Sequence, residues 1–374
     1  MTIPQPSSGK SLVRPESHVQ MRDNRSVILD QVDVPIVLAP MAGGPSTPEL
    51  TAAVAEAGGF AQLAAGYLSA ADTAARIAAT RAATAKPFGV NLFVPGPPTP
   101  AADLADYLAE LGADHTLGDP RYDTDDWDAK LDLLVADPVA AVSFTFGCPS
   151  AAEIGRLHAA GSEIWVTVTS VDEARVAVEA GADVLIAQGA EAGGHRATFV
   201  DRPADDTADP LGLLALLQLL TAATDRPLVA TGGLATGAGI AAALAAGAVA
   251  AQLGTVFLRC PEAGTSQVHR TALTADTPTM LTRAFTGRRA RGLRNRFLLR
   301  HSATAPVGYP EIHYATAPLR AAARAAGNPD EVNLWAGQAH TLTPESPAGE
   351  LVAQLAADTK AALEKALSRR IQHY

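Results

Sequence analysis

The chain is poor in cysteine, in aromatic residues and in positive charge, and the first and last of these shortages each exclude a class of protein. Only two cysteines, Cys148 and Cys260, occur among 374 residues, and they form no CxxC pair. This excludes a disulfide framework and a cysteine-rich zinc site, and it fits a reducing compartment. The formal net charge of −10 argues against nucleic-acid binding, which needs a dense basic patch.

Long apolar runs are also missing. The N-terminal segment is polar and lacks the apolar core of a signal peptide, so we expect residues 1–25 to form a flexible tail. No run reaches the roughly 18 apolar residues that a membrane-spanning helix needs. We therefore expect a cytoplasmic protein without a membrane or nucleic-acid partner. The sequence indicates no oligomeric state.

Motifs of several enzyme classes are absent too. The chain has no HExxH, no P-loop and no GxSxG, which argues against the enzyme classes that these motifs define. The segment GAGIAA, from Gly237, differs from a dinucleotide fingerprint because its glycines lie inside a predicted helix start. The strand after it also ends in Gln252, where that fingerprint requires an acidic residue.

Short apolar runs alternate with helical patterns along most of the chain. Aromatics make up only 5% of the residues, so we expect a core of small aliphatic side chains. The alternation predicts a parallel α/β sheet, and eight repeats of it predict closure into a (β/α)8 TIM barrel over residues 26–262. The eight predicted strands are 36–39, 59–66, 88–93, 140–147, 163–168, 184–187, 226–233 and 249–255.

The pattern changes after the eighth predicted strand. Residues 263–374 are too many for one barrel helix, so we expect a smaller C-terminal lobe that covers the carboxyl ends of the barrel strands and closes the site. This part contains the one basic run of the chain, for which a solvated loop and an anion-facing loop both stay open. The run consists of Arg288, Arg289, Arg291, Arg294, Arg296 and Arg300.

Two further features allow a chemical and a structural interpretation. Cys148, at the end of the fourth predicted strand, is either a nucleophile or a small buried thiol at the barrel mouth. The acidic patch of Asp123, Asp125, Asp126 and Asp128 lacks the glycine and the closing glutamate of an EF-hand loop. It therefore favours a solvated helix N-terminus, and we expect no metal site.

The most informative stretch is DVLIAQGAEAGGHR, from Asp183 to Arg196. Its apolar run predicts a strand buried on both faces, and the small, glycine-rich turn after it carries His195. Polar loops at the carboxyl ends of parallel strands are where barrels place their chemistry. An imidazole titrates near neutral pH and can take a proton from carbon, so we predict His195 as the catalytic base.

Two glycine turns follow the seventh and eighth predicted strands. The sequences are ATGGLATG, from Ala230, and QLGT, from Gln252. Such turns present free backbone N–H groups, and the loops after these two strands form the frequent phosphate site of barrels. The sequence therefore predicts a phosphorylated cofactor at this edge.

These segments resemble one known family. PIVLAPMAGG, DVLIAQGAEAGGHR, PLVATGGLATG and AQLGTVFL are similar to the motifs of the nitronate monooxygenases, formerly called 2-nitropropane dioxygenases. These are FMN-dependent TIM-barrel enzymes, and the resemblance covers most of residues 33–340. It implies an enzyme that oxidises alkyl nitronates with O2 to carbonyl compounds and nitrite, with nitroalkanes left open as further substrates.

The resemblance also implies a set of FMN-binding residues, with His195 as the base. They are Ala39, Pro40, Met41, Asn91, Gln188, Gly193, Gly194, Gly232, Gly233, Gln252, Leu253, Gly254 and Thr255.

One position departs from the family pattern. Where relatives read SFHFGLP, this chain reads SFTFGCP, which puts Thr145 at the place of a substrate-facing histidine. Two rival functions therefore stay open. One is another FMN barrel oxidoreductase, such as an enoyl-ACP reductase or an NAD(P)H:quinone reductase. The other is a flavin-binding barrel without catalysis, which would leave His195 without a purpose.

Overall fold

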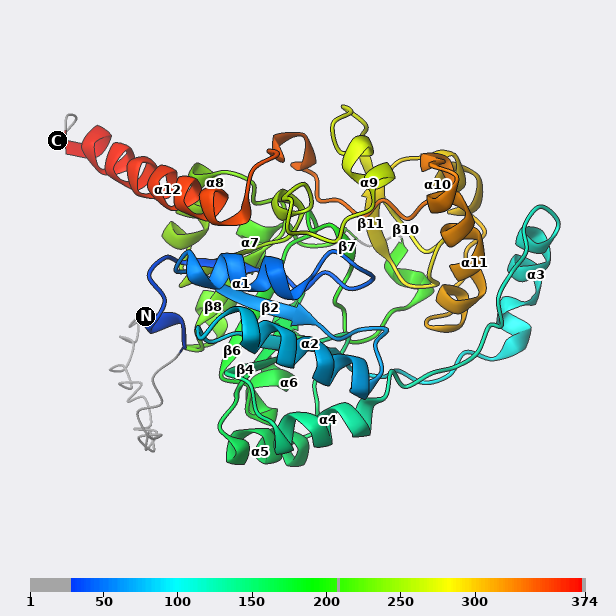
Figure 1. Ribbon diagram of the computed structural model, residues 1–374, viewed down its shortest axis with the longest axis horizontal. Coiled ribbons are helices and arrows are strands. Elements are labelled where there is room, and N and C mark those ends of the chain that lie inside the picture. Colours follow the sequence, from blue (N-terminus) through cyan, green and yellow to red (C-terminus); the bar gives the residue numbers. More distant parts are fainter. Residues whose placement is uncertain (1–27, 207–208, 372–374) are drawn as a thin grey trace, which may run out of the picture.

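The centre of the protein is a closed barrel of eight parallel strands (Figure 1). The structure is a computed structural model and describes residues 28–206 and 209–371. Each strand pairs with the next along the chain, and the last pairs with the first, which confirms the predicted (β/α)8 TIM barrel. The strands are β1 (Ile36–Leu38), β2 (Phe60–Ala64), β3 (Gly89–Phe93), β4 (Ala141–Thr145), β5 (Glu163–Val168), β6 (Val184–Gln188), β8 (Leu228–Thr231) and β9 (Ala250–Leu253).

Side chains fill the barrel, and two of them are large aromatic rings, in addition to the small aliphatic residues that the sequence led us to expect. The rings of Phe60 and Trp165 pack against each other in its interior in a tilted arrangement, with centroids 5.0 Å apart. Val37, Val184 and Val229 pack around them. The parallel register then carries the polar strand ends to one rim. Residues further along each strand line up there, for instance Gln188 beside Thr231, which in turn lies beside Gln252.

Helices surround the barrel and begin where the sequence places capping residues. Thr47 caps the first, with Pro48 at the first helical position, and Ser150 and Glu153 form a capping box at the start of α5. The helix after β6 has Gly212 as its N-cap, without a side-chain cap. The barrel helices are α1 (Pro48–Glu56), α2 (Ala70–Ala83), α4 (Trp127–Ala136), α5 (Ala151–Ala160), α6 (Val171–Ala180), α7 (Leu213–Ala223) and α8 (Gly237–Ala245).

A smaller antiparallel sheet lies over the carboxyl ends of the strands. It consists of β10 (Thr279–Thr282), β11 (Ala290–Leu293) and β7 (Gly194–His195), in the order β10-β11-β7. The strand β7 comes from the loop after β6, and His195 pairs with Ala290 of β11. The lobe is therefore joined to the barrel by backbone pairing at His195, the residue predicted as the catalytic base. Three helices complete this part: α9 (Gln267–Ala272), α10 (Arg296–His301) and α11 (Glu311–Ala325).

Two helices pack away from their neighbours in the sequence. The helix α3 (Ala101–Gly112) leaves the barrel and packs through Leu104, Tyr107 and Leu111 against α10 and α11 of the lobe (Figure 1). The last helix, α12 (Ala348–Ile371), returns to the barrel and packs against α8 and α1. The division at residue 262 stays a prediction, and the predicted tail lies outside the described residues. No helix in the described chain is long and apolar enough to cross a membrane.

Candidate active site

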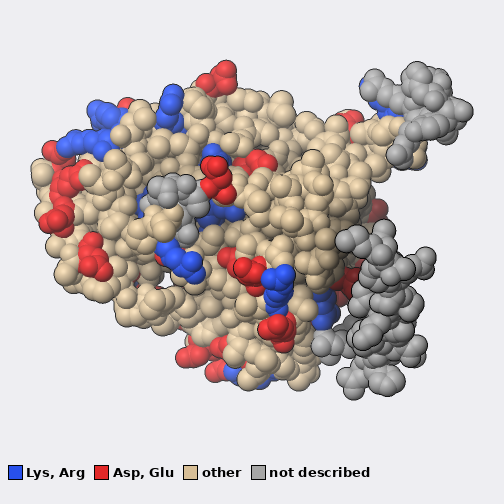
Figure 2. Space-filling model, turned by 180° about the vertical axis from the view of Figure 1, so that it is seen from behind, with Lys and Arg blue, Asp and Glu red and all other residues tan. Residues whose placement is uncertain are grey.

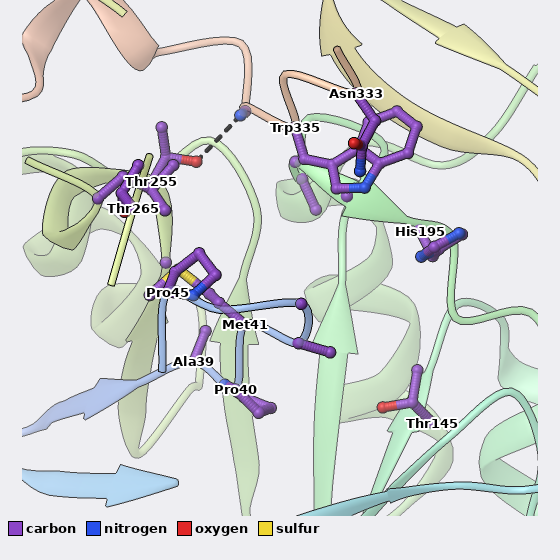
Figure 3. A pocket seen from close by; sticks show the side chains of 18 of the residues that line it. Ala39, Pro40, Met41, Pro45, Thr145, His195, Thr255, Thr265, Asn333 and Trp335 are labelled. Atoms are coloured by element: carbon purple, nitrogen blue, oxygen red, sulfur yellow. Dashed lines mark hydrogen bonds between the residues drawn. The ribbon is translucent and has the colours of Figure 1, made fainter. Parts of the chain in front are cut away.

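A cavity of about 610 Å³ lies between the carboxyl ends of the barrel strands and the lobe. Its size is typical of sites for a cofactor and a small substrate. Every site residue predicted from the sequence lines this cavity, from Ala39, just after the first strand, to Thr255, after the last. In Figure 3, Ala39, Pro40 and Met41 lie across from His195 and Trp335.

The strand-end amides are largely held by the protein itself. The Nδ2 group of Asn91 donates to Oγ of Ser143 at 2.9 Å and to Oγ1 of Thr145 at 3.1 Å. The hydroxyl of Thr145 thus lines the cavity at a position fixed by Asn91. This leaves the side-chain oxygen of Asn91, Oδ1, as the group that can contact a ligand.

The amide of Gln188 positions the loop that carries the histidine. Its Nε2 donates to the carbonyl of His195 at 3.0 Å, and its Oε1 accepts from the N–H of Ala197, also at 3.0 Å. Both polar ends of Gln188 are therefore engaged, although the side chain lines the cavity. In Gln252 the Oε1 atom accepts from Gln62, at 3.3 Å, and its Nε2 group stays available to a ligand.

The two glycine turns present unused donors to the cavity. In the described chain no acceptor is recorded for the backbone N–H groups of Gly233, Leu234, Gly254 and Thr255. The hydroxyl of Thr255 has another task, because it accepts from the N–H of Gly337 at 3.0 Å and ties the lobe to the turn (Figure 3). Four N–H groups without a protein acceptor, on residues that line one cavity, suit a phosphate.

The glycines before His195 serve two different purposes. A Cβ atom on Gly193 would lie 2.5 Å from the backbone of Ala336, so this glycine lets a lobe segment approach. The resemblance had implied Gly193 as an FMN-binding residue, and the same glycine also lines the cavity. Gly194 has φ +72°, a backbone conformation that favours glycine, and no heavy atom lies within 4 Å of the place of a Cβ.

His195 lies against the hydroxyl of Thr286, with Nε2 and Oγ1 2.9 Å apart. Burial, together with the positive charges of Arg288 and Arg320, lowers the pKa of His195 to about 3. The imidazole is therefore neutral at physiological pH. Its Nδ1 atom has no hydrogen-bond partner in the described part of the chain.

Aromatic rings enclose the imidazole. The centroids of Phe146, Tyr309 and Trp335 lie 5.5 to 5.7 Å from the centroid of His195. These rings bury the imidazole, and burial is the main reason for its lowered pKa, ahead of the charges of Arg288 and Arg320.

Comparison with known proteins agrees with this geometry. A family model described as nitronate monooxygenase matches residues 25–358. A nitronate monooxygenase of Pseudomonas aeruginosa is 41% identical over 349 residues, which cover 87% of this chain and 95% of that protein. The solved structure of nitroalkane oxidase from Streptomyces ansochromogenes is 48% identical, with a TM-score of 0.89, and covers 91% of this chain and 100% of its own.

The chain belongs to the nitronate monooxygenase family. A more distant likeness joins it to the FabK structure from Thermotoga maritima, which is 26% identical with a TM-score of 0.73 and covers 91% of this chain and 97% of its own.

In this member of the nitronate monooxygenase family, the lobe adds cavity residues that the sequence did not predict. His313, Arg320 and Arg324 come from α11, and Trp335 comes from the segment after it. The ring of His313 stacks on Tyr67, with centroids 4.0 Å apart. No local signal marks these residues, because only the packing of the lobe turns one side of α11 toward the barrel.

The basic run serves structure and not the cavity. None of its arginines lines the cavity. Arg288 donates to the carbonyls of Arg196 and Thr198, and Arg291 donates to the carbonyl of Ala190, so both hold the loop after β6. Arg296 and Arg300 form surface ion pairs. Neither of the two interpretations left open, a solvated loop or an anion-facing loop, describes Arg288 and Arg291, which are buried.

Two other interpretations need correction. Cys148 does not line the cavity, and burial raises the pKa of its thiol to about 11, which argues against a nucleophile. The acidic patch is solvated only in part. Asp125 accepts the N–H of Tyr67 at 2.8 Å and pairs with Lys130 at 2.8 Å, and the Lys130 side chain is 1% exposed. Asp125 thus supports the cavity wall at Tyr67, whose φ is +67°.

Proposed function

We propose that this protein is an FMN-dependent nitronate monooxygenase that oxidises alkyl nitronates with O2 to carbonyl compounds and nitrite. One observation carries the proposal. A single cavity joins a neutral, enclosed imidazole, His195, to the free N–H groups of the two glycine turns. The family membership of the chain gives this combination of a proton-handling group and a phosphate site its meaning.

FMN fits the residues that the cavity offers. The N–H groups of Gly233, Leu234, Gly254 and Thr255 suit a terminal phosphate, and no adenine-binding unit is visible in the sequence, which favours FMN over FAD. The remaining proposed cofactor contacts come from the strand ends and from the loop after β1. When bound, the flavin supplies the redox chemistry, and the protein supplies binding and electrostatics.

The protein residues have distinct proposed roles at the substrate. The Nδ1 atom of His195 accepts a proton from a neutral nitroalkane or lies against the nitronate once the proton is gone. The hydroxyl of Thr145, held by Asn91, contacts the substrate where family members have a histidine. The rings of Phe146, Tyr309 and Trp335 keep bulk water away from the reacting carbon.

The decisive experiment has two parts. Flavin released from the purified protein is identified by chromatography, and FMN is the expected species. Oxygen uptake and nitrite formation are then measured with a series of alkyl nitronates. Release of FAD or no flavin would contradict the cofactor, and no turnover with any nitronate would contradict the reaction.

The likeness to FabK calls for one control. The flavoprotein is mixed with NADH or NADPH under anaerobic conditions, and its visible absorbance is followed. A nitronate monooxygenase should keep its oxidised spectrum. Rapid bleaching, without turnover of nitronates, would instead favour a nicotinamide-dependent reductase of the same fold.

A further inference from the structure

The charges that line the cavity are all of one sign. Two arginines, Arg320 and Arg324, line it, whereas none of the described aspartate or glutamate residues does. The protein as a whole has a formal net charge of −10, and the outer face in Figure 2 shows basic and acidic groups interspersed. A positive interior in an acidic protein concentrates anions inside the cavity.

Arg320 lines the cavity and has no carboxylate partner among the described residues. It is 4% exposed, its Nε donates to Oγ1 of Thr316 at 3.1 Å, and its Nη2 donates to the carbonyl of His313 at 2.6 Å. In the described chain no acceptor is recorded for Nη1 and no ion pair for the guanidinium. By contrast Arg283, which is 3% exposed, pairs with the carboxylate of Asp201 at 2.7 Å.

A buried cation without a counter-ion is costly unless neutral acceptors or a ligand satisfy its N–H groups. The neutral partners of Arg320 fix its plane and leave one N–H edge for such a ligand. Arg324, one turn further along α11, already donates to Oδ1 of Asn333. The field of Arg320 also reaches the catalytic region, because it contributes to the lowered pKa of His195 and of His313.

We propose that Arg320 binds the anionic nitro group of the substrate and makes the enzyme select ionised nitronates over neutral nitroalkanes. This inference rests on the proposed function for the identity of the anion. The guanidinium recognises two oxygens of one planar group, as it does in carboxylates. A neutral nitroalkane gains less from the same contact, because its oxygens carry less charge.

The first test replaces Arg320 by glutamine. For Arg320→Gln we expect the KM for a nitronate to rise about 10- to 100-fold, the usual effect of losing a charge-assisted hydrogen bond. The KM for the corresponding neutral nitroalkane should change much less, and FMN content should stay that of the wild type. Arg300→Gln is the control. It removes the same charge from a surface pair with Asp114, at 2.6 Å, outside the cavity.

A second pair of variants keeps the arginine and its hydrogen bonds. Ala317 lines the cavity three residues before Arg320 on α11. In Ala317→Glu a carboxylate can pair with Arg320 along the helix, whereas Ala317→Gln has the same size without charge. We expect a higher KM for nitronates in the glutamate variant only. This pair decides the matter if Arg320→Gln does not fold.

A binding measurement separates this inference from the proposed reaction. Nitrate, a planar anion, is titrated into the holoprotein by calorimetry, without turnover. Binding to the wild type that is lost in Arg320→Gln supports the anion site even if no nitronate is oxidised. The proposal would be overturned if Arg320→Gln bound nitrate as well as the wild type does, or if its KM for the nitronate were unchanged. Loss of FMN at an unchanged KM would overturn it too. The last result would assign the cation to the cofactor.

Discussion

The Nε2 atom of His195 and the Oγ1 atom of Thr286 lie 2.9 Å apart, and this contact decides which imidazole nitrogen can act as a base. The hydroxyl of Thr286 donates its one proton to the carbonyl of Arg288, at 3.2 Å. It must then accept from Nε2–H, since this arrangement satisfies all three groups. The lone pair of the neutral imidazole is therefore on Nδ1.

Thr286→Val tests this assignment. Valine has a similar shape but accepts no hydrogen bond, so the imidazole loses the partner that fixes its tautomer. We expect kcat/KM with a neutral nitroalkane to fall about tenfold, the scale of one lost hydrogen bond. The 15N chemical shifts of His195 should change from those of an Nε2–H imidazole to those of a tautomer mixture.

Thr286→Ser is the matched control for that variant, because it keeps the hydroxyl. It should retain the wild-type 15N shifts and most of the activity. If the serine and valine variants lose activity equally, Thr286 acts through packing and the tautomer argument fails.

The phosphate turns can be tested at Gly254. A Cβ atom there would lie 3.4 Å from Cβ of Ala39 and 3.5 Å from Sδ of Met41, which are ordinary contacts. At Gly233 it would lie 2.7 Å from Cβ of Glu191, so a side chain at Gly233 would disturb the fold as well. We expect Gly254→Asp to fold but to lose FMN, because like charges a few ångströms apart repel by about 1–4 kcal/mol.

Asparagine at the same position has the size of aspartate without its charge. Gly254→Asn should therefore retain more FMN than Gly254→Asp, as measured by the ratio of flavin to protein absorbance after gel filtration. Equal FMN content in the two variants would place the phosphate elsewhere.

Much of this fold and site follows from local patterns in the sequence. Buried strands, glycine turns and caps such as Thr47 and Ser150 are local signals, and the closed barrel then brings the strand ends to one rim. The residues above the rim could not be predicted in this way. The pairing of His195 with Ala290 and the place of Arg320 depend on how a distant part of the chain packs.

The acidic patch shows the same limit on a smaller scale. Its composition fits a solvated helix start, and nothing local reveals that Asp125 reaches Lys130 and the backbone of Tyr67. A charge whose partner becomes buried is visible only after folding, since burial is a property of the whole packing arrangement.

Asp125→Asn should therefore be strongly destabilising. It leaves the ammonium group of Lys130, whose side chain is 1% exposed, without a counter-charge. Removing one partner of a buried pair typically costs about 3–5 kcal/mol, and we expect that loss in the free energy of unfolding from urea titration. The double variant Asp125→Asn with Lys130→Met should recover much of it. A single variant as stable as the wild type would show that the pair contributes little.

The proton-handling role of His195 leads to a prediction about pH. Its pKa is lowered to about 3 in the folded protein, so the neutral, proton-accepting form prevails at every pH above that value. Activity with a neutral nitroalkane should therefore not fall through protonation of His195 as the pH decreases from 8 to 5. A fall with an apparent pKa near the ordinary value of about 6.5 would show that the imidazole is more solvated during turnover.

His195→Asn separates proton transfer from binding. Asparagine keeps a hydrogen-bonding side chain of similar reach but cannot accept a proton from carbon. With a neutral nitroalkane the expected loss in kcat/KM is about 10²–10⁴-fold, the usual contribution of a general base. With the pre-formed nitronate the proton is already gone, so the loss should be smaller and limited to orientation.

Both forms of one substrate are compared by oxygen consumption at matched flavin concentration. We expect the variant to retain its flavin, because the N–H groups assigned to the phosphate do not include that of His195. Equal losses on the two forms would remove the base role and leave His195 as a binding group. No loss on either form would mean that His195 is structural. Its contact with Thr286 and the hydrogen bond from Gln188 to its backbone carbonyl would then only hold the lobe on the barrel.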